Sequence, residues 1–184
     1  MNPRFTAPRG TFDVVPPEGE DVLRIREALS AGVRSAGYRY IETPAFEDTA
    51  LFVRGVGEST DVVTKEMYDF VDKGDRHIAL RPEMTASVCR AFAEHRPTTP
   101  WKIFYSGSNF RYEKPQRGRY RQFDQVGVEV LGADDSNLDV EVIALAWEFY
   151  VRLGLRQVTL IVNSLGELAA RARYVEALRL PFVA

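Results

Sequence analysis

Apolar side chains recur at helical spacing in several separate stretches of the chain. Between residues 18 and 36, valine, leucine and isoleucine return every three or four positions, and Gly37 follows as a stop signal. Residues 83–96 show the same spacing between Pro82, which suits a helix start, and Pro97, which ends it. The spacing predicts helices over residues 18–36, 83–96, 137–153 and 167–180.

Between these helices lie short runs that are rich in aromatic and β-branched residues. Two of them flank Asp72-Lys73-Gly74-Asp75, which predicts a hairpin with Gly74 at positive φ. Strands are expected over residues 38–43, 67–71, 77–81, 101–113, 119–131 and 157–162, with short helical turns and loop over 45–65 and an irregular arm over 1–17. Hairpin-linked strands are antiparallel, so the predicted class is α+β: a mainly antiparallel sheet flanked by helices that pack on one side.

Composition supports one packed domain, because 45% of the residues are hydrophobic and 27% are charged. The net charge of −2 does not favour a polyanion, so any such site must be local. A single cysteine, Cys89, excludes an internal disulfide and favours a reducing, cytoplasmic setting. We expect no membrane span, no secretory signal and no metal site.

The strongest local charge lies in the turn between the strands predicted over 101–113 and 119–131. Residues 114–121 contain four cations and no acid: Lys114, Arg117, Arg119 and Arg121. Such a turn would suit a polyphosphate or the end of an RNA. The alternative is that a turn is simply a solvated place for charge.

The alternation of side chains in these two strands adds a pattern to that charge. Odd positions from Arg119 to Glu129 share one face, and the valines at 126, 128 and 130 share the other, which we assign to the core. Phe123 and Glu129 stand roughly 20 Å apart along this face, enough for a base at one end and a small polar ligand at the other. If Arg111 pairs with Phe123, Gly107 lies opposite Gly127, and the middle of this face has no side chains. Alternatively, both glycines mark bulges.

These residues resemble motif 2 of the class II aminoacyl-tRNA synthetases, a phenylalanine-arginine-x-glutamate signature followed by a basic loop and a phenylalanine. Residues 110–125 (FRYEKPQRGRYRQFDQ) are similar to the histidyl-tRNA synthetase family in particular. Residues 42–44 resemble motif 1, and residues 51–68 and 80–86 also match that family. The resemblance runs from about Pro8 to Leu165. It implies the class II catalytic fold in truncated form: residues 1–184 would be a partial catalytic domain that has motifs 1 and 2 and lacks motif 3 and the anticodon-binding domain.

The resemblance implies a histidine–tRNA ligase, which activates histidine with ATP, with Mg²⁺ expected, and transfers it to tRNA(His). Arg111 would be catalytic, gripping the α-phosphate and the histidine carboxylate. The other implied contacts are Glu113 and Phe123 with adenine, Arg119 with the outer phosphates, Glu83, Thr85 and Gln125 with the α-ammonium, Glu129 with the imidazole, and Lys114 and Gln116 with the tRNA end. Residues 1–184 alone would be inactive or weakly active. Family membership also implies a homodimer, formed through the helix from Glu18 and the strand ending at Pro44.

Two positions depart from the family pattern, and two acids have alternative explanations. Met84 stands where glycine is common and would narrow the pocket, whereas Asp124, often histidine, lies by parity on the face away from the ligand. Without the resemblance, Glu83 is an acid in the first turn of a helix, favoured by the helix dipole. Glu129 among valines has no such explanation, because an unpaired buried carboxylate is costly.

A second function shares this fold: the histidine-sensing regulatory subunit of ATP phosphoribosyltransferase, which does not aminoacylate tRNA. The presence of Arg111, Glu113, Arg119 and Phe123 favours the enzyme. A plain interaction domain would bind neither ATP nor histidine.

Overall fold

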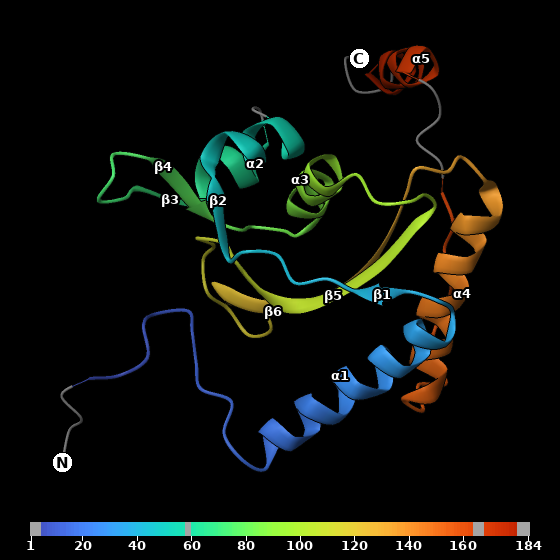
Figure 1. Cartoon of the computed structure of the whole chain (residues 1–184), viewed down its shortest axis with the longest axis horizontal. Coiled ribbons are helices and arrows are strands. Elements are labelled where there is room, and N and C mark those ends of the chain that lie inside the picture. Colours follow the sequence, from blue (N-terminus) through green and yellow to red (C-terminus); the bar gives the residue numbers. More distant parts are fainter. Residues whose placement is uncertain (1–4, 58–59, 164–167, 180–184) are drawn as a thin grey trace. The chain divides into compact units, whose positions relative to one another are not determined.

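The computed structural model of the chain describes residues 5–57, 60–163 and 168–179, and it divides into a unit at Met1–Gly154 and a unit at Leu155–Ala184. The first unit mixes helices and strands, so the predicted α+β class is confirmed (Figure 1). Its elements, in chain order, are α1 (Glu18–Ser35), β1 (Arg39–Tyr40), β2 (Phe46–Asp48), α2 (Thr49–Val56), the π-helix η1 (Val62–Glu66), β3 (Tyr68–Val71), β4 (His77–Leu80), α3 (Thr85–His95), β5 (Trp101–Phe110), β6 (Gln122–Leu131) and α4 (Ser136–Arg152). The second unit contains α5 (Leu168–Arg179).

The strands of the first unit form two sheets of three strands each. One sheet has the order β1-β5-β6, in which β5 and β6 are antiparallel and β1 lies parallel to β5. The other has the order β2-β4-β3 and is antiparallel throughout. The pairing is therefore mainly antiparallel, as predicted, with β1 as the exception.

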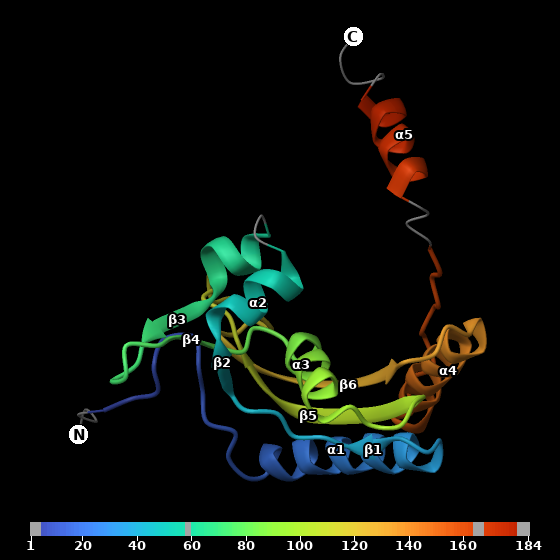
Figure 2. The same ribbon diagram turned by 45° about the horizontal axis from the view of Figure 1, so that its top comes forward.

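Helices cover both faces of the β1-β5-β6 sheet, so the prediction that they pack on one side is wrong. Helix α3 lies over one face (Figure 2), where its Val88 packs with Ile103 and Tyr105 of β5. On the other face, alternate residues such as Phe104 and Val128 pack with side chains of α1 and α4. The physical reason is that both faces of β5 carry apolar side chains, and each of them needs a cover.

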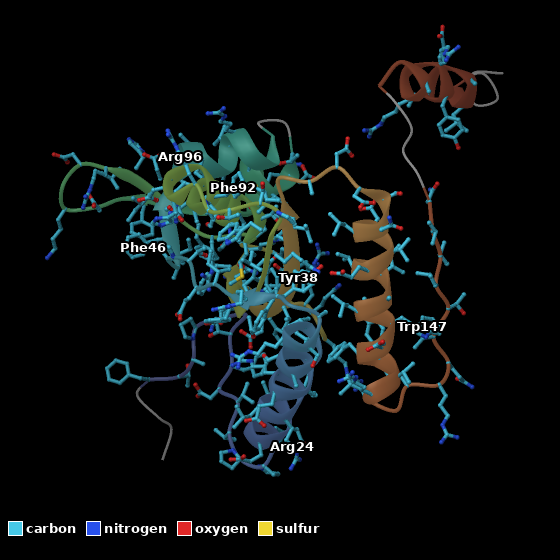
Figure 3. All side chains as sticks on the ribbon, turned by 45° about the vertical axis from the view of Figure 1, so that its right-hand side comes forward. Arg24, Tyr38, Phe46, Phe92, Arg96 and Trp147 are labelled. Atoms are coloured by element: carbon cyan, nitrogen blue, oxygen red, sulfur yellow. The ribbon has the colours of Figure 1, made fainter. Side chains whose placement is uncertain are left out.

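Helix α1 shows how its sequence places a helix against the sheet. Val33 is buried, whereas Arg24 lies on the solvent side (Figure 3). Gly37, with φ of 86°, turns the chain at the end of the helix, and Tyr38 follows with 1% of its surface exposed. The predicted helix over residues 18–36 is thus confirmed to within one residue.

Three predictions about local structure need correction. The turn between β3 and β4 has positive φ at Asp75 (58°) and not at Gly74. The Asp72 carboxylate organises this turn by accepting the N–H groups of Gly74 (2.8 Å) and Arg76 (3.0 Å), which relieves the need for a left-handed glycine. The region 45–65 contains a strand, β2, that its polar residues concealed.

The strand predicted over residues 157–162 is also wrong, because these residues have no strand assignment in the described part of the second unit. Their apolar alternation suits a strand, but a strand needs a hydrogen-bonded neighbour, and alternation does not supply one. The ends of the helix predicted over 167–180 fall outside the described residues, and α5 confirms the rest of it. Among the described residues, no helix combines the length and apolar character needed to cross a membrane.

Candidate functional site

Strands β5 and β6 present the residues that the sequence singled out, and their register decides which of them meet. The ladder pairs Asn109 with Phe123, Gly107 with Gln125 and Ile103 with Glu129. Odd positions therefore face odd positions, as predicted, but the predicted pairing of Arg111 with Phe123 is wrong by two residues. The cause is the connection between the strands, which is asymmetric: Arg111 is still hydrogen-bonded to Arg121 (2.9 Å), whereas the tip pairs Gln116 with Arg119.

Gly107 and Gly127 do not leave the middle of this face empty, and they are not bulges in the ladder. A Cβ at Gly127 would lie 2.4 Å from Cζ and Oη of Tyr105, which occupies that space. A Cβ at Gly107 would lie 2.7 Å from Nη2 of Arg81 and 2.8 Å from Cε of Met84. Both glycines therefore make room for side chains of the protein itself. The expectation of an open middle is wrong.

At one end of this face, the Glu129 carboxylate is held by two hydroxyl groups. Thr85 at the start of α3 donates to Oε1 of Glu129 at 2.7 Å, and Tyr105 of β5 donates to the same oxygen at 3.2 Å. Burial, together with the charge of Glu129, raises the pKa of Tyr105 to about 12, so this hydroxyl stays a donor at neutral pH. Sequence reasoning missed Tyr105, although its odd position on β5 was a usable signal.

Glu83 lies immediately before α3 and caps that helix. Its carboxylate accepts the backbone N–H groups of Thr85 (2.6 Å) and Ala86 (2.9 Å). The helix therefore begins at Thr85, two residues later than predicted, so Glu83 precedes the first turn in which the sequence placed it and acts as a cap. The cap also fixes the carboxylate on the same side of the sheet as Glu129, since Thr85 contacts both acids.

Gln125 lies between the two ends of the face and is oriented by a buried neighbour. Asn109, which is fully buried, donates from Nδ2 to Oε1 of Gln125 at 2.6 Å. Oε1 of the Gln125 side chain retains a second lone pair, and the side-chain NH₂ group provides donors. The odd position of Asn109 predicts its place on this face, but not its role in orienting Gln125.

At the other end of the face, Arg111 and Phe123 lie together. The guanidinium carbon of Arg111 stands 5.2 Å from the centre of the Phe123 ring, within the range of a cation–π contact. Nε of Arg111 donates to the backbone oxygen of Pro82 at 2.9 Å, which ties this arginine to the segment that leads into α3. The predicted grouping of Arg111, Phe123, Gln125 and Glu129 on one face is therefore confirmed in its geometry.

The basic turn is less free than the sequence suggested. Arg119 forms an ion pair with Glu113, whose side chain is buried. Lys114 and Gln116 are exposed on the turn. The two residues that the resemblance assigns to adenine and to the outer phosphates thus neutralise each other in this structure.

Arg81 is a further residue that the sequence did not mark. It is 8% exposed, and its guanidinium donates to the backbone oxygens of Ser108 (2.8 Å), Thr43 (2.8 Å) and Pro44 (3.3 Å). Burial lowers the pKa of Arg81. Arg81 follows β4 directly and thus joins the end of that strand to the segment after β1 and to strand β5.

Asp124 lies on the opposite face of the sheet, as its even position predicted. Its carboxylate pairs with Arg26 of α1 and accepts a hydrogen bond from the Ser108 hydroxyl at 2.8 Å. The valine side of β6 packs against α1 and α4, and an apolar cavity of ≈ 340 Å³ lies there. Asp124 therefore contributes to packing between helix and sheet and not to the charged face.

A larger cavity, ≈ 680 Å³, opens between α2 and α3 beside the charged face. Glu83 and Thr85 reach it from one side, and Arg54 and Cys89 line it further along. Burial, with the charges of Glu129 and Glu83, raises the pKa of the Cys89 thiol. Within the described ranges, no three or more His, Cys, Asp or Glu side chains gather in a way that could hold a metal ion.

Comparison with known proteins gives a consistent result. The family model described as histidyl-tRNA synthetase matches residues 10–178. The histidine–tRNA ligase of Streptomyces avermitilis is 54% identical over 179 residues, which cover 95% of this chain and 43% of that protein. The histidine–tRNA ligase of Mycobacterium tuberculosis is 54% identical over 178 residues, with coverage of 95% and 42%.

Solved structures agree with the sequence relatives. Apo histidyl-tRNA synthetase of S. aureus superimposes with a TM-score of 0.78 at 40% identity, covering 95% of this chain and 41% of that one. A Bacillus halodurans structure described as an ATP phosphoribosyltransferase regulatory subunit/histidyl-tRNA synthetase gives a TM-score of 0.71 at 28% identity, with coverage of 84% and 39%. The chain thus spans about two fifths of the length of the proteins that it matches.

Proposed function

Because the chain belongs to the histidyl-tRNA synthetase family, we propose that the protein carrying it is a histidine–tRNA ligase. It would form histidyl-adenylate from histidine and ATP and transfer the histidyl group to tRNA(His). One observation carries this proposal: Arg111 with Phe123 at one end, and Glu129 with Thr85 at the other, occupy the same face of β5 and β6. That arrangement provides a place for a nucleotide next to a place for a cationic amino acid.

At the amino-acid end, fixed acceptors match the chemistry of histidine. Glu129, held by Thr85 and Tyr105, would accept an N–H of the imidazole. Glu83, Thr85 and Gln125 would surround the α-ammonium. Because the cap on α3 already fixes the Glu83 carboxylate, little rotamer entropy is lost when the ligand binds.

At the nucleotide end, Phe123 would stack on adenine, and Arg111 would neutralise the charge that develops at the α-phosphorus when the histidine carboxylate attacks it. Such a reaction depends mainly on positioning and on electrostatic stabilisation. Nε of Arg111 is already engaged by Pro82, which leaves the two Nη groups for the phosphate and the carboxylate. Glu113 would bind adenine and Arg119 the outer phosphates, so we propose that ATP separates this ion pair.

The remaining partners belong to the same proposal. Mg²⁺ would enter with the ATP phosphates, and Lys114 and Gln116 would contact the acceptor end of the tRNA from their exposed positions on the turn. Residues 1–184 would form the first part of a class II catalytic domain. The protein would act in the cytoplasm as a homodimer, for which the exposed Leu23 and Tyr40 provide apolar surface around α1 and β1.

The similarity to the Bacillus halodurans structure keeps a histidine-sensing regulatory subunit as the second candidate. Histidine-dependent exchange of pyrophosphate into ATP separates the two functions. We expect the full-length protein that carries this sequence to catalyse the exchange, and Arg111→Ala to lower it by at least 100-fold, on the order of the loss of one transition-state contact. Arg117→Ala, on the exposed part of the same turn, is the matched control and should retain activity.

Three results would separate the alternatives. Histidine binding without exchange would favour the regulatory subunit, and binding of neither ATP nor histidine would indicate an interaction domain. Residues 1–184 alone should show little exchange. Robust adenylate formation by residues 1–184 would contradict the proposal that further catalytic residues lie in the part of the family's sequence that these residues do not cover.

A further inference from the structure

The segment before α1 that the sequence left as an irregular arm contacts the basic turn between β5 and β6. The carbonyl oxygen of Gly10 accepts the backbone N–H of Arg121 at 2.8 Å. Nη1 of Arg121 donates to the carbonyl oxygen of Arg9 at 3.5 Å. The Phe12 ring lies against Tyr120, with ring centres 4.5 Å apart. Three separate contacts therefore join the arm to two consecutive residues of the turn.

The arm keeps its own shape through local bonds. Thr11 donates to the carbonyl oxygen of Pro8 from its backbone N–H (3.0 Å) and from its hydroxyl (2.8 Å). Gly10 adopts a φ of 85°, and a Cβ there would lie 2.7 Å from Cγ and Cδ of Arg121 and 3.1 Å from Pro115. Only glycine combines this backbone conformation with such close approach to the turn.

Arg121 links the arm to Arg111 and Glu113, the residues that would face the nucleotide. Its backbone oxygen accepts the N–H of Arg111 at 2.9 Å, and its Nε donates to the carbonyl oxygen of Glu113 at 3.2 Å. Its guanidinium carbon lies 3.8 Å from the centre of the Tyr112 ring. A continuous series of hydrogen bonds thus runs from Gly10 through Arg121 to Arg111.

We propose that residues 8–12 are a positioning element of the nucleotide site, which holds Arg121 and, through it, Arg111 and Glu113 in the geometry that binds ATP. This inference rests on the proposed function. The amino-acid end depends on other supports, because Thr85 and Tyr105 hold Glu129. Arg111 would also contact the histidine carboxylate, so the arm should affect both ligands, and ATP, which would meet Glu113 as well, more strongly than histidine.

The chain offers a matched pair of variants for the test. Gly10 and Gly37 have φ of 85° and 86°, so alanine strains both backbones equally, but only Gly10 has atoms within 4 Å of the added Cβ. In the full-length protein that carries this sequence, Gly10→Ala should lower kcat/KM for ATP in pyrophosphate exchange by at least tenfold and weaken histidine binding by a clearly smaller factor. Gly37→Ala should leave both unchanged. Amide hydrogen exchange over residues 111–121 should quicken in Gly10→Ala and not in Gly37→Ala.

A second variant protects the test against a folding defect. Phe12→Ala removes only the ring contact with Tyr120, and we expect it to lower kcat/KM for ATP by about threefold with an unchanged melting temperature. Equal behaviour of Gly10→Ala and Gly37→Ala would overturn the inference, as would equal losses for ATP and histidine. A parent protein without any exchange would instead overturn the proposed function.

Discussion

Gly127→Ala tests whether the space above this glycine belongs to Tyr105, as the geometry indicates. The new Cβ would lie 2.4 Å from Cζ and Oη of Tyr105, whereas non-bonded carbon atoms prefer about 3.5–4.0 Å. The Tyr105 ring must therefore retreat by about 1 Å. A shift of that size would break the 3.2 Å hydrogen bond from the Tyr105 hydroxyl to Glu129.

The expected loss of stability follows from these two effects. Overpacking of a filled site costs about 1–3 kcal/mol, and a hydrogen bond to a charged group contributes about 1.5–3 kcal/mol. Because the two effects share one side chain and are not additive, we expect Gly127→Ala to lower the free energy of unfolding by about 3 kcal/mol. Urea unfolding of the 184-residue chain, followed by the fluorescence of Trp101 in β5 and Trp147 in α4, measures this quantity.

A double-mutant cycle makes the reasoning refutable. Tyr105→Leu removes the atoms that the new Cβ would strike, so Gly127→Ala in that background should cost less than about 1 kcal/mol, a coupling of about 2 kcal/mol. Gly74→Ala, in an exposed turn where the nearest atom is 3.4 Å from the Cβ, is the control and should leave the midpoint in place. Additive effects of the two substitutions would show that Tyr105 does not occupy the space above Gly127.

Three other substitutions test separate features of the site. The pKa of Tyr105, raised to about 12, exceeds the value of about 10 for an unfolded tyrosine. The stability that this tyrosine confers is therefore complete below pH 10 and declines as the pH rises toward 12. Tyr105→Phe should flatten that decline in urea unfolding from pH 9 to 12, and an unchanged slope of stability against pH would contradict the reasoning. Arg81→Met leaves two carbonyl oxygens without their 2.8 Å partners and should lower the free energy of unfolding by about 2–4 kcal/mol in the same assay. Arg81→Lys should recover part of this loss. A loss under about 1 kcal/mol would show that water replaces these bonds. Asp124→Ala breaks an exposed pair with Arg26 and should cost less than about 1 kcal/mol while histidine binding, followed by calorimetry, stays the same; a binding defect would place Asp124 in the site.

Strand parity was the most reliable of the sequence-based inferences. Side chains alternate with a period of two, so a register error of two residues left Arg111, Phe123, Gln125 and Glu129 on one face, and an error of one would have inverted the site. The register itself was not predictable, because it depends on how residues 111–121 fold as an irregular turn. Helix positions were also predictable, since glycine and proline mark their ends.

The features that sequence reasoning missed depend on contacts between segments far apart in the chain. Tyr105 and Asn109 orient the predicted ligands Glu129 and Gln125 from the neighbouring strand, and nothing local distinguishes them from core residues. Arg81 acts through backbone oxygens, which carry no sequence signature. The strand predicted over residues 157–162 failed for the related reason that an apolar run does not specify its partner.

Arg81 has a consequence for how this family of sequences varies. Its acceptors at positions 43, 44 and 108 include a main-chain carbonyl oxygen in each case, which every amino acid supplies. Position 44 belongs to the segment that resembles motif 1, but at 108 natural variation in the side chain should therefore be wider than at 81. Where a buried cation binds main-chain oxygens, the evolutionary constraint therefore falls on the cation more than on the side chain of its acceptor residue.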